Sequence, residues 1–162
     1  LNSTMSANCV CLFQSESGSS VHGILTLSQA SDDSPTIITG EIKGLSPGKH
    51  GLSIHVYGDL SDGATTCGEI FNPFGQPHGF PNDPNRKVGS LGNITAGEDG
   101  KAQVRVEDSM VKLIGPHSVI GRSMVIHASE DDGGRGGHEN SLQTGNTGPR
   151  VAAGVIGLSS GA

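Results

Sequence analysis

The chain has 162 residues, of which 26 are glycine, and its formal net charge is −6. Hydrophobic residues make up 33% before glycine is counted and charged residues only 16%, a composition that argues against a disordered chain. The acidic balance, with one tyrosine, four phenylalanines and no tryptophan, argues against a nucleic-acid partner. No stretch approaches the roughly 18 apolar residues of a membrane span, so we expect none.

Short runs of β type follow one another along the chain, and helical periodicity is nearly absent. The clearest strands are expected at 21–27, 37–42, 51–56, 102–106, 123–127 and 151–158. Turns are expected at 44–48 and 97–100, where glycine recurs. Many short strands with abundant glycine predict an all-β sandwich or barrel, in a single domain over residues 1–162.

Two long segments interrupt this pattern of strands. Residues 59–93 contain four prolines and little strand signal, and residues 130–149 are rich in glycine and charge. Loops of this length inside a compact domain are usually functional or disordered. Each segment also holds a histidine, His78 in the first and His138 in the second, so both are candidate places for a site.

The cysteines and histidines by themselves define no site. The number and spacing of Cys9, Cys11 and Cys67 do not suggest a disulfide framework. The first two share one face of an apparent strand, where we interpret them as small buried hydrophobic residues. None of the seven histidines lies in an H-E-x-x-H motif, and no G-x-S-x-G motif is present. Local spacing therefore leaves the chemistry open.

Five segments carry a longer and more specific pattern. They read HGLSIHVYGD (50–59), FNP followed by HG (71–79), VGSLGNITA (88–96), IGRSMVIH (120–127) and GNTGPRVAAGVIG (145–157). In this order they resemble the signatures H-G-F-H-V-H-x-x-G-D, H-F-N-P…H-G-G-P, V-G-D-L-G-N-V-T-A, I-G-R-T-L-V-V-H and G-N-A-G-S-R-L-A-C-G-V-I-G of the copper/zinc superoxide dismutases. The resemblance implies an eight-stranded Greek-key β-barrel of the immunoglobulin-like sandwich architecture, with two long functional loops.

The resemblance implies that this chain keeps half of the family's copper ligands. His55 and His127 stand at two of the four copper-binding histidines, whereas Ser53 and Ile70 stand at the other two. Ile70 occupies the position of the histidine that bridges copper and zinc, and isoleucine has no lone pair to donate. A serine hydroxyl is a poor substitute for imidazole at such an ion. Copper is therefore the candidate cofactor, and the opposite interpretation, that both histidines are remnants of a lost site, stays equally open.

The resemblance retains less of the family's zinc site. His78 is the residual zinc-type histidine, because Lys87 and Ser90 replace two other ligands. An ammonium group has no lone pair and repels a cation. We therefore expect the family's zinc site to be absent.

The family's disulfide is replaced as well. Ala64 and Ala153 stand at its two cysteine positions, and Cys67 lies three residues beyond the first, so it is no simple replacement. The lost ligands and cysteines together predict that residues 59–93 are more mobile than the equivalent loop of the family.

Other parts of the family's mechanism are retained by resemblance. Arg150 stands at the arginine that guides superoxide, Thr144 at the threonine that narrows the channel, and Asp131 at the aspartate that links the copper and zinc ligands. Arg150 has a second interpretation, in which it only braces its loop. Local positive charge in a cleft can attract an anion even to an acidic chain. Superoxide or another small anion is the expected partner, and the resemblance also implies a homodimer.

Three hypotheses follow from these residues. The first is an antioxidant oxidoreductase, at most a reduced single-metal superoxide dismutase that forms oxygen and hydrogen peroxide at His55 and His127, with protons from water. The second is a non-catalytic pseudo-enzyme that binds a metal or a partner on the barrel. The third and weaker one is a copper-chaperone-like module, whose usual metal-binding extensions are missing here. Cytoplasmic and secreted locations are both left open.

Overall fold

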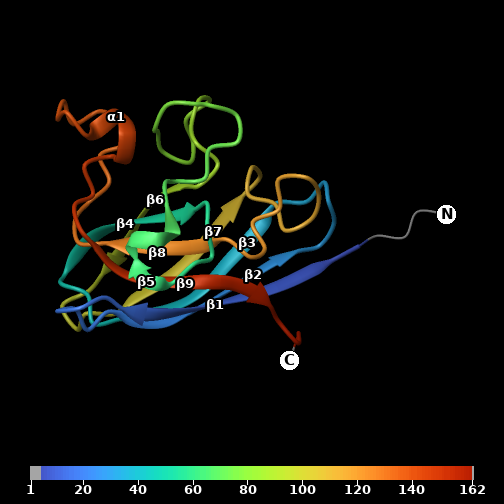
Figure 1. Ribbon diagram of the computed structural model, residues 1–162, viewed down its shortest axis with the longest axis horizontal. Coiled ribbons are helices and arrows are strands. Elements are labelled where there is room, and N and C mark those ends of the chain that lie inside the picture. The colour runs from blue at the N-terminus through green and yellow to red at the C-terminus, as the bar shows by residue number, and fades with distance from the viewer. Residues whose placement is uncertain (1–4, 162) are drawn as a thin grey trace.

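The computed structural model describes residues 5–161, which form an antiparallel β-barrel that is nearly closed (Figure 1). Eight strands make one sheet in the order β6-β4-β8-β9-β1-β2-β3-β7. Their bounds are β1 Ala7–Ser15, β2 His22–Gln29, β3 Thr36–Lys43, β4 Gly48–His55, β6 Ser90–Ala96, β7 Ala102–Asp108, β8 Ser123–His127 and β9 Arg150–Leu158. The end strands β6 and β7 contact each other without a shared ladder. This architecture confirms the predicted eight-stranded Greek-key barrel.

Strands such as β1 and β2 bury one face because apolar residues recur at every second position, whereas β8 and most of β4 are buried on both faces. In β1, Cys9, Cys11 and Phe13 are buried, and in β2 the same is true of Leu25 and Leu27. The two cysteines of β1 thus share the inner face, as the sequence predicts. Their side chains belong to the single large apolar core that fills the barrel.

Six predicted strands are present, with ends that differ by a few residues. They correspond to β2, β3, β4, β7, β8 and β9. The prediction missed β6, which is interrupted by Gly92 at a φ of 74° and is broken in register against β4. It also missed the short strand β5 (Ser61–Ala64), whose sequence contains no β-branched or aromatic residue.

Two long loops project from the same end of the barrel (Figure 1). The first runs from β4 to β6 and contains β5 and a 3-10 turn, η1 (Thr65–Cys67). The second runs from β8 to β9 and contains the one-turn helix α1 (Ser141–Thr144). Hydrogen bonds join the loops, among them one from Lys87 Nζ to the carbonyl of Gln143 at 2.6 Å. Among residues 5–161, no helix is both long and apolar enough to cross a membrane.

Candidate functional site

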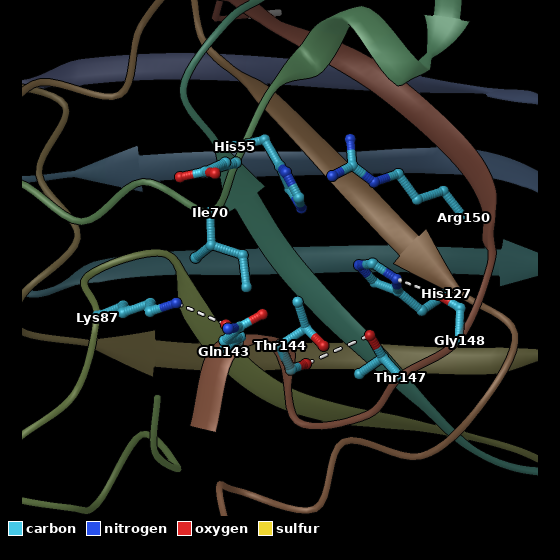
Figure 2. Close-up of a pocket in the computed structure, with 10 residues that line it drawn as sticks. His55, Ile70, Lys87, His127, Gln143, Thr144, Thr147, Gly148 and Arg150 are labelled. Atoms are coloured by element: carbon cyan, nitrogen blue, oxygen red, sulfur yellow. Dashed lines mark hydrogen bonds between the residues drawn. The ribbon is translucent and has the colours of Figure 1, made fainter. Parts of the chain in front are cut away.

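A cavity of about 430 Å³ opens between the two loops and the ends of β4, β8 and β9. It is lined by His55, Glu69, Ile70, Lys87, His127, Gln143, Thr144, Thr147, Gly148 and Arg150 (Figure 2). The fold therefore brings together four residues that the resemblance singled out, namely His55, His127, Thr144 and Arg150. It places Ile70 opposite His55, because the two residues form an antiparallel β-bridge.

The two histidines of the cavity end neighbouring strands. His55 is the last residue of β4 and His127 the last of β8, and their ring centroids lie 5.9 Å apart. Nδ1 of His55 lies 2.8 Å from the carbonyl of Gly68, and Nδ1 of His127 lies 3.3 Å from the carbonyl of Gly148. Because a carbonyl oxygen only accepts, these contacts assign the proton to Nδ1 in both rings. Each Nε2 is then left with a lone pair.

Both of these Nε2 atoms converge on one hydroxyl group. Ser53 shares the face of His55 on β4, since the two residues are two apart. Its Oγ lies 2.8 Å from Nε2 of His55 and 3.2 Å from Nε2 of His127. One hydroxyl carries one hydrogen, so it can donate to only one of the two nitrogens at a time. The second lone pair is left without a hydrogen, which makes the point of convergence attractive to a cation.

Burial keeps the two imidazoles neutral. It lowers the pKa of His55 to about 3 and that of His127 to about 4. The hydrogen bonds to Gly68 and Gly148 oppose these shifts, whereas the Arg150 guanidinium adds to both. Neutral imidazole is the form of histidine that binds a metal.

Arg150 begins β9, and its side chain both bonds the first loop and lines the cavity. Its Nη1 donates a hydrogen bond of 2.7 Å to the carbonyl of Ala64, so it does brace the first loop. The same side chain also lines the cavity (Figure 2). The two interpretations of this arginine are therefore compatible in one conformation.

The two positions of the family's disulfide are packed as alanines. Ala64 and Ala153 are buried in a small apolar cluster with Cys67 and Val125. All three cysteines of the described residues are free and buried. Apolar packing, and the hydrogen bond from Arg150 to Ala64, therefore hold the start of the first loop against the barrel.

A hydrogen-bonded chain runs from Ser90 at the start of β6 through His78 of the first loop to Asp131 of the second loop. Nε2 of His78 lies 2.8 Å from Oδ1 of Asp131, and Nδ1 of His78 lies 3.0 Å from Oγ of Ser90. All three side chains are buried. The carboxylate accepts from Nε2–H, so the remaining nitrogen accepts from the serine hydroxyl. Both ring nitrogens of His78 thus have a protein partner.

Asp131 is held rigidly at this junction. Its backbone N–H and carbonyl bond the side chain of Asn93, and its Oδ1 also accepts from the N–H of Gly133. Gly145 passes so close that a Cβ there would lie 1.9 Å from Oδ1 of Asp131, so only glycine fits. Within residues 5–161, Asp131 has no hydrogen bond to His55 or His127. It bonds one histidine, His78.

The donor sets fit the two metals of the resemblance differently. Two converging imidazole nitrogens, fixed in orientation by carbonyl groups, fit a copper ion that completes its shell with other ligands. A zinc site needs four protein ligands, or three and a water. Around His78 the replaced positions offer the serine hydroxyl of Ser90 and the ammonium of Lys87, which do not fit. Across residues 5–161, no group of three or more His, Cys, Asp or Glu side chains is arranged to hold a metal ion.

Some residues of the cavity escaped the sequence analysis. Glu69, Gln143, Thr147 and Gly148 also line it. Three of them lie within seven residues of Arg150, so proximity to that residue is a signal that could have found them. Lys87 was considered only as a lost ligand, yet it contributes a cationic side chain to the wall of the cavity.

Comparison with known proteins agrees with this geometry. The family model for copper/zinc superoxide dismutase (SODC) matches residues 21–156. A protein of Candida glabrata named Cu-Zn superoxide dismutase is 55% identical over 139 residues, which cover 85% of this chain and 90% of that relative. The residues matched by the family model include both long loops and every strand of the barrel except β1 and the last two residues of β9. The chain therefore belongs to the copper/zinc superoxide dismutase family.

Proposed function

We propose that this chain is a superoxide dismutase that uses a single redox-active metal held by His55 and His127. The observation that carries the proposal is the convergence of two neutral Nε2 atoms on the Ser53 hydroxyl, from two histidines that line the same cavity as Arg150. The balanced reaction takes two superoxide ions and two protons to one dioxygen and one hydrogen peroxide. One superoxide is oxidised and the other is reduced.

The histidines supply the binding and the orientation. When bound, copper supplies the alternating one-electron transfers that the reaction requires, and zinc alone does not, because it is redox-inert. Copper(II) also binds a given nitrogen and oxygen site more tightly than zinc does. The carbonyls of Gly68 and Gly148 hold the rings with Nε2 toward the cavity. Such outer hydrogen bonds typically change metal affinity or activity 10–100-fold.

Arg150 and Thr144 act on the substrate. The guanidinium supplies positive charge at the cavity wall, which raises the local concentration of an anion and orients it. Thr144 lines the same cavity and restricts its cross-section. Ile70 cannot carry a proton, so protons come from water, and the Ser53 hydroxyl beside both Nε2 atoms can relay one.

We propose that the zinc of the family is absent from this chain. His78 shares its two nitrogens with Asp131 and Ser90, and Lys87 bonds Gln143. The bonds from His78 to Asp131 and from Lys87 to Gln143 join the two long loops, whereas the family's zinc positions in this chain all lie in the first loop or at the start of β6. Hydrogen bonding between the two loops therefore needs no metal ion.

A second function, a non-catalytic member of the family, is favoured by one specific observation. The ammonium of Lys87 lines the same cavity as the two imidazoles, and it is one of the charges that disfavour added positive charge at His55. A cation entering the cavity meets the same repulsion. The pocket would then serve anion binding without redox chemistry.

Metal analysis of the purified protein distinguishes the two functions. The protein is loaded with copper, dialysed, and assayed for bound copper and zinc and for dismutase activity. We expect about one copper per chain, no stoichiometric zinc, and activity that follows the bound copper. His127→Gln and His55→Gln are expected to lose both the copper and the activity.

His22→Gln is the matched control, because His22 is exposed on β2 and does not line the cavity. It should retain the copper and the activity of the unmodified chain. A loaded protein with neither stoichiometric copper nor activity would eliminate the dismutase and leave the non-catalytic function. Copper that survives both cavity substitutions would place the metal elsewhere.

A further inference from the structure

Ala64 ends β5 in the first long loop, and charged side chains bond both of its backbone polar groups. Its N–H donates to Oε1 of Glu16, and its carbonyl accepts a hydrogen bond of 2.7 Å from Nη1 of Arg150. Ala64 is buried, and a buried backbone group that lacks a partner costs free energy. One residue of the loop is therefore held between a carboxylate and a guanidinium.

The carboxylate of Glu16 packs directly against the chain beside Ala64. A Cβ added to Gly63 would lie 2.6 Å from Oε2 and 2.7 Å from Oε1 of Glu16. Gly63 also has a φ of 55°, a conformation that favours glycine. The lack of a side chain at residue 63 leaves the room in which Glu16 reaches the N–H of Ala64.

Both charged residues belong to one pair of strands. Glu16 directly follows β1, and its N–H donates to the carbonyl of Val151 on β9 at 2.9 Å. Arg150 precedes Val151 and begins β9. The two strands are paired, with Ser15 opposite Ala152. They form a common base from which the carboxylate and the guanidinium reach the loop.

Apolar packing is incomplete where the loop meets this base. Ala64 and Ala153 bring no sulfur atoms to the place where the resemblance puts a disulfide, and a cavity of about 50 Å³ lies beside Ala153. The residues that line this small cavity are Gln14, Ser15, Glu16, Leu60, Gly63 and Ala153. Atoms that line a void lose van der Waals contacts. The hydrogen bonds of Ala64 therefore carry more of the attachment between the loop and the barrel.

We propose that Glu16 is a positioning residue for Arg150. By holding the N–H of Ala64, the carboxylate fixes the residue whose carbonyl holds the guanidinium, and Arg150 lines the cavity with the two histidines. Among residues 5–161, the lining of that cavity does not include Glu16, so Glu16 acts through the loop. The effect on the reaction rests on the proposed function, whereas the effect on Ala64 and Arg150 does not.

Amide exchange and NMR of chelator-treated protein test the positioning without any metal. In Glu16→Ala, the amide of Ala64 should exchange about tenfold faster or more, which corresponds to 1.4 kcal/mol of lost protection. The side-chain N–H signals of Arg150 should shift and broaden, because the carbonyl of Ala64 no longer holds the guanidinium in one place. Glu16→Gln retains an oxygen acceptor on a side chain of the same length, and it should restore most of the protection and the signal positions.

The copper-loaded protein tests the consequence for the reaction. The rate constant per bound copper in Glu16→Ala should fall about threefold or more and should depend less steeply on ionic strength. The reason is that a misplaced guanidinium attracts the anion less, and salt screens that attraction. A loss of structure alone would lower the bound copper or the unfolding temperature and would leave the salt dependence as it was. Copper content and thermal unfolding are therefore measured for each variant.

Two further variants are the controls. Glu98→Ala removes an exposed carboxylate from the turn between β6 and β7, and it should leave the exchange of Ala64, the Arg150 signals and the rate unchanged. Ala64→Cys with Ala153→Cys replaces the hydrogen-bonded attachment by a covalent one. Once mass spectrometry shows that this bridge has formed, adding Glu16→Ala should have little effect on the Arg150 signals.

Unchanged exchange at Ala64 in folded Glu16→Ala would overturn the inference. Faster exchange with unchanged Arg150 signals would do the same, since the carbonyl would then hold the guanidinium without Glu16, and so would equal effects in Glu98→Ala. Copper-loaded protein that is inactive would contradict only the proposed function, because the exchange and NMR measurements still apply. An active dismutase whose rate and salt dependence are unchanged in Glu16→Ala would contradict only this inference.

Discussion

Oγ of Ser53 lies 2.8 Å from Nε2 of His55, so a hydroxyl group fills the point where the imidazoles of the cavity converge. The serine stands at the position of a copper-binding histidine in the family, and it supplies one hydrogen to two acceptors. The protein therefore supplies a hydrogen-bond donor to only one of the two Nε2 lone pairs at a time. This partial satisfaction is the physical basis for expecting a bound cation there.

Restoring the two missing histidines should strengthen copper binding. Ser53 lies between the imidazoles, and Ile70 faces His55 across a β-bridge and lines the cavity. We expect Ser53→His with Ile70→His to raise copper affinity by about tenfold or more, which corresponds to 1.4 kcal/mol of added ligand binding. Competition with a chromophoric chelator measures the affinity.

Ser28→His is the control for this pair, because Ser28 is exposed on β2. It adds an imidazole away from the cavity and should leave the affinity for copper unchanged. Equal affinities of the double variant and the unmodified chain would mean that position 70 does not reach the ion.

The buried histidines predict an acid-sensitive fold. The pKa of His55 falls to about 3 and that of His127 to about 4 on folding, from an ordinary value near 6.5. The unfolded chain therefore binds more protons than the folded chain between about pH 3 and 6.5, and stability rises with pH across that window. Each histidine contributes up to about 1.4 kcal/mol per pH unit.

Urea unfolding of chelator-treated protein between pH 4 and 7 measures this effect. The free energy of unfolding should fall as the pH decreases from about 6.5, and the slope should be smaller in His127→Gln. His22→Gln, which changes an exposed histidine, should retain the slope of the unmodified chain. A stability that is flat over this range would mean that both imidazoles take up protons as readily in the folded protein as in the unfolded chain.

A disulfide can be introduced where the family has one. Ala64 and Ala153 are buried in the same small cluster and bound a loop of about 90 residues. In the chain-entropy model, a bridge closing that loop contributes up to about 4.6 kcal/mol, and typical bridges contribute 2–4. We expect Ala64→Cys with Ala153→Cys to raise the free energy of unfolding by an amount that reductant removes.

The same double variant tests the mobility predicted for residues 59–93. Amide hydrogen exchange in this segment should slow when the bridge forms, because the start of the loop is then tied to β9. Each single cysteine variant is the control and should exchange as the unmodified chain does. Slow exchange throughout the segment before any bridge is introduced would contradict the predicted mobility.

A buried ion pair fixes the segment that carries Lys87 and Ser90. Nη2 of Arg86 contacts the two carboxylate oxygens of Asp108 at 2.6 and 2.5 Å, and Nη1 donates to the carbonyl of Ser90 at 2.6 Å. Asp108→Ala leaves a buried guanidinium without its partner, so we expect a loss of about 3–5 kcal/mol of stability. Chemical denaturation measures the loss.

The chain offers a matched surface pair for comparison. Glu107 and Arg105 lie 3.8 Å apart on β7, and both side chains are exposed. Glu107→Ala should cost less than about 1 kcal/mol. Equal losses of stability in the two variants would show that burial of the Arg86–Asp108 pair adds nothing to its contribution to the free energy of unfolding.

The homodimer implied by the resemblance has a candidate face on the outside of the barrel. Leu12 on β1 and Ile24 on β2 are register partners, and they are 56% and 50% exposed. We expect sedimentation to show a dimer, and Leu12→Glu with Ile24→Glu to convert it to a monomer, because burying a charge without a partner is costly. Thr95→Glu, at an exposed polar position on β6 far from β1 and β2 in the strand order, should leave the dimer intact. A monomer in the unmodified protein would contradict the expectation.

Local patterns were sufficient for most of the fold. Alternating apolar residues predicted six strands, and turn residues marked their limits. The same approach missed β6, because Gly92 and polar residues interrupt its alternation, and it missed β5, which is held by loop contacts and has little intrinsic strand preference. In both cases, tertiary pairing overrode a weak local signal.

The sequence by itself determined which chemical groups are present. It identified the retained histidines, His55 and His127, and the positions that changed, among them Ser53 and Lys87, since the identity of a side chain needs no coordinates. Only the tertiary structure decided how these groups are used. It brought the Ser53 hydroxyl between two imidazoles and turned Lys87 toward Gln143, 56 residues further along the chain. Such contacts depend on how two loops pack at one end of the barrel, which is a property of the whole chain and of no local segment.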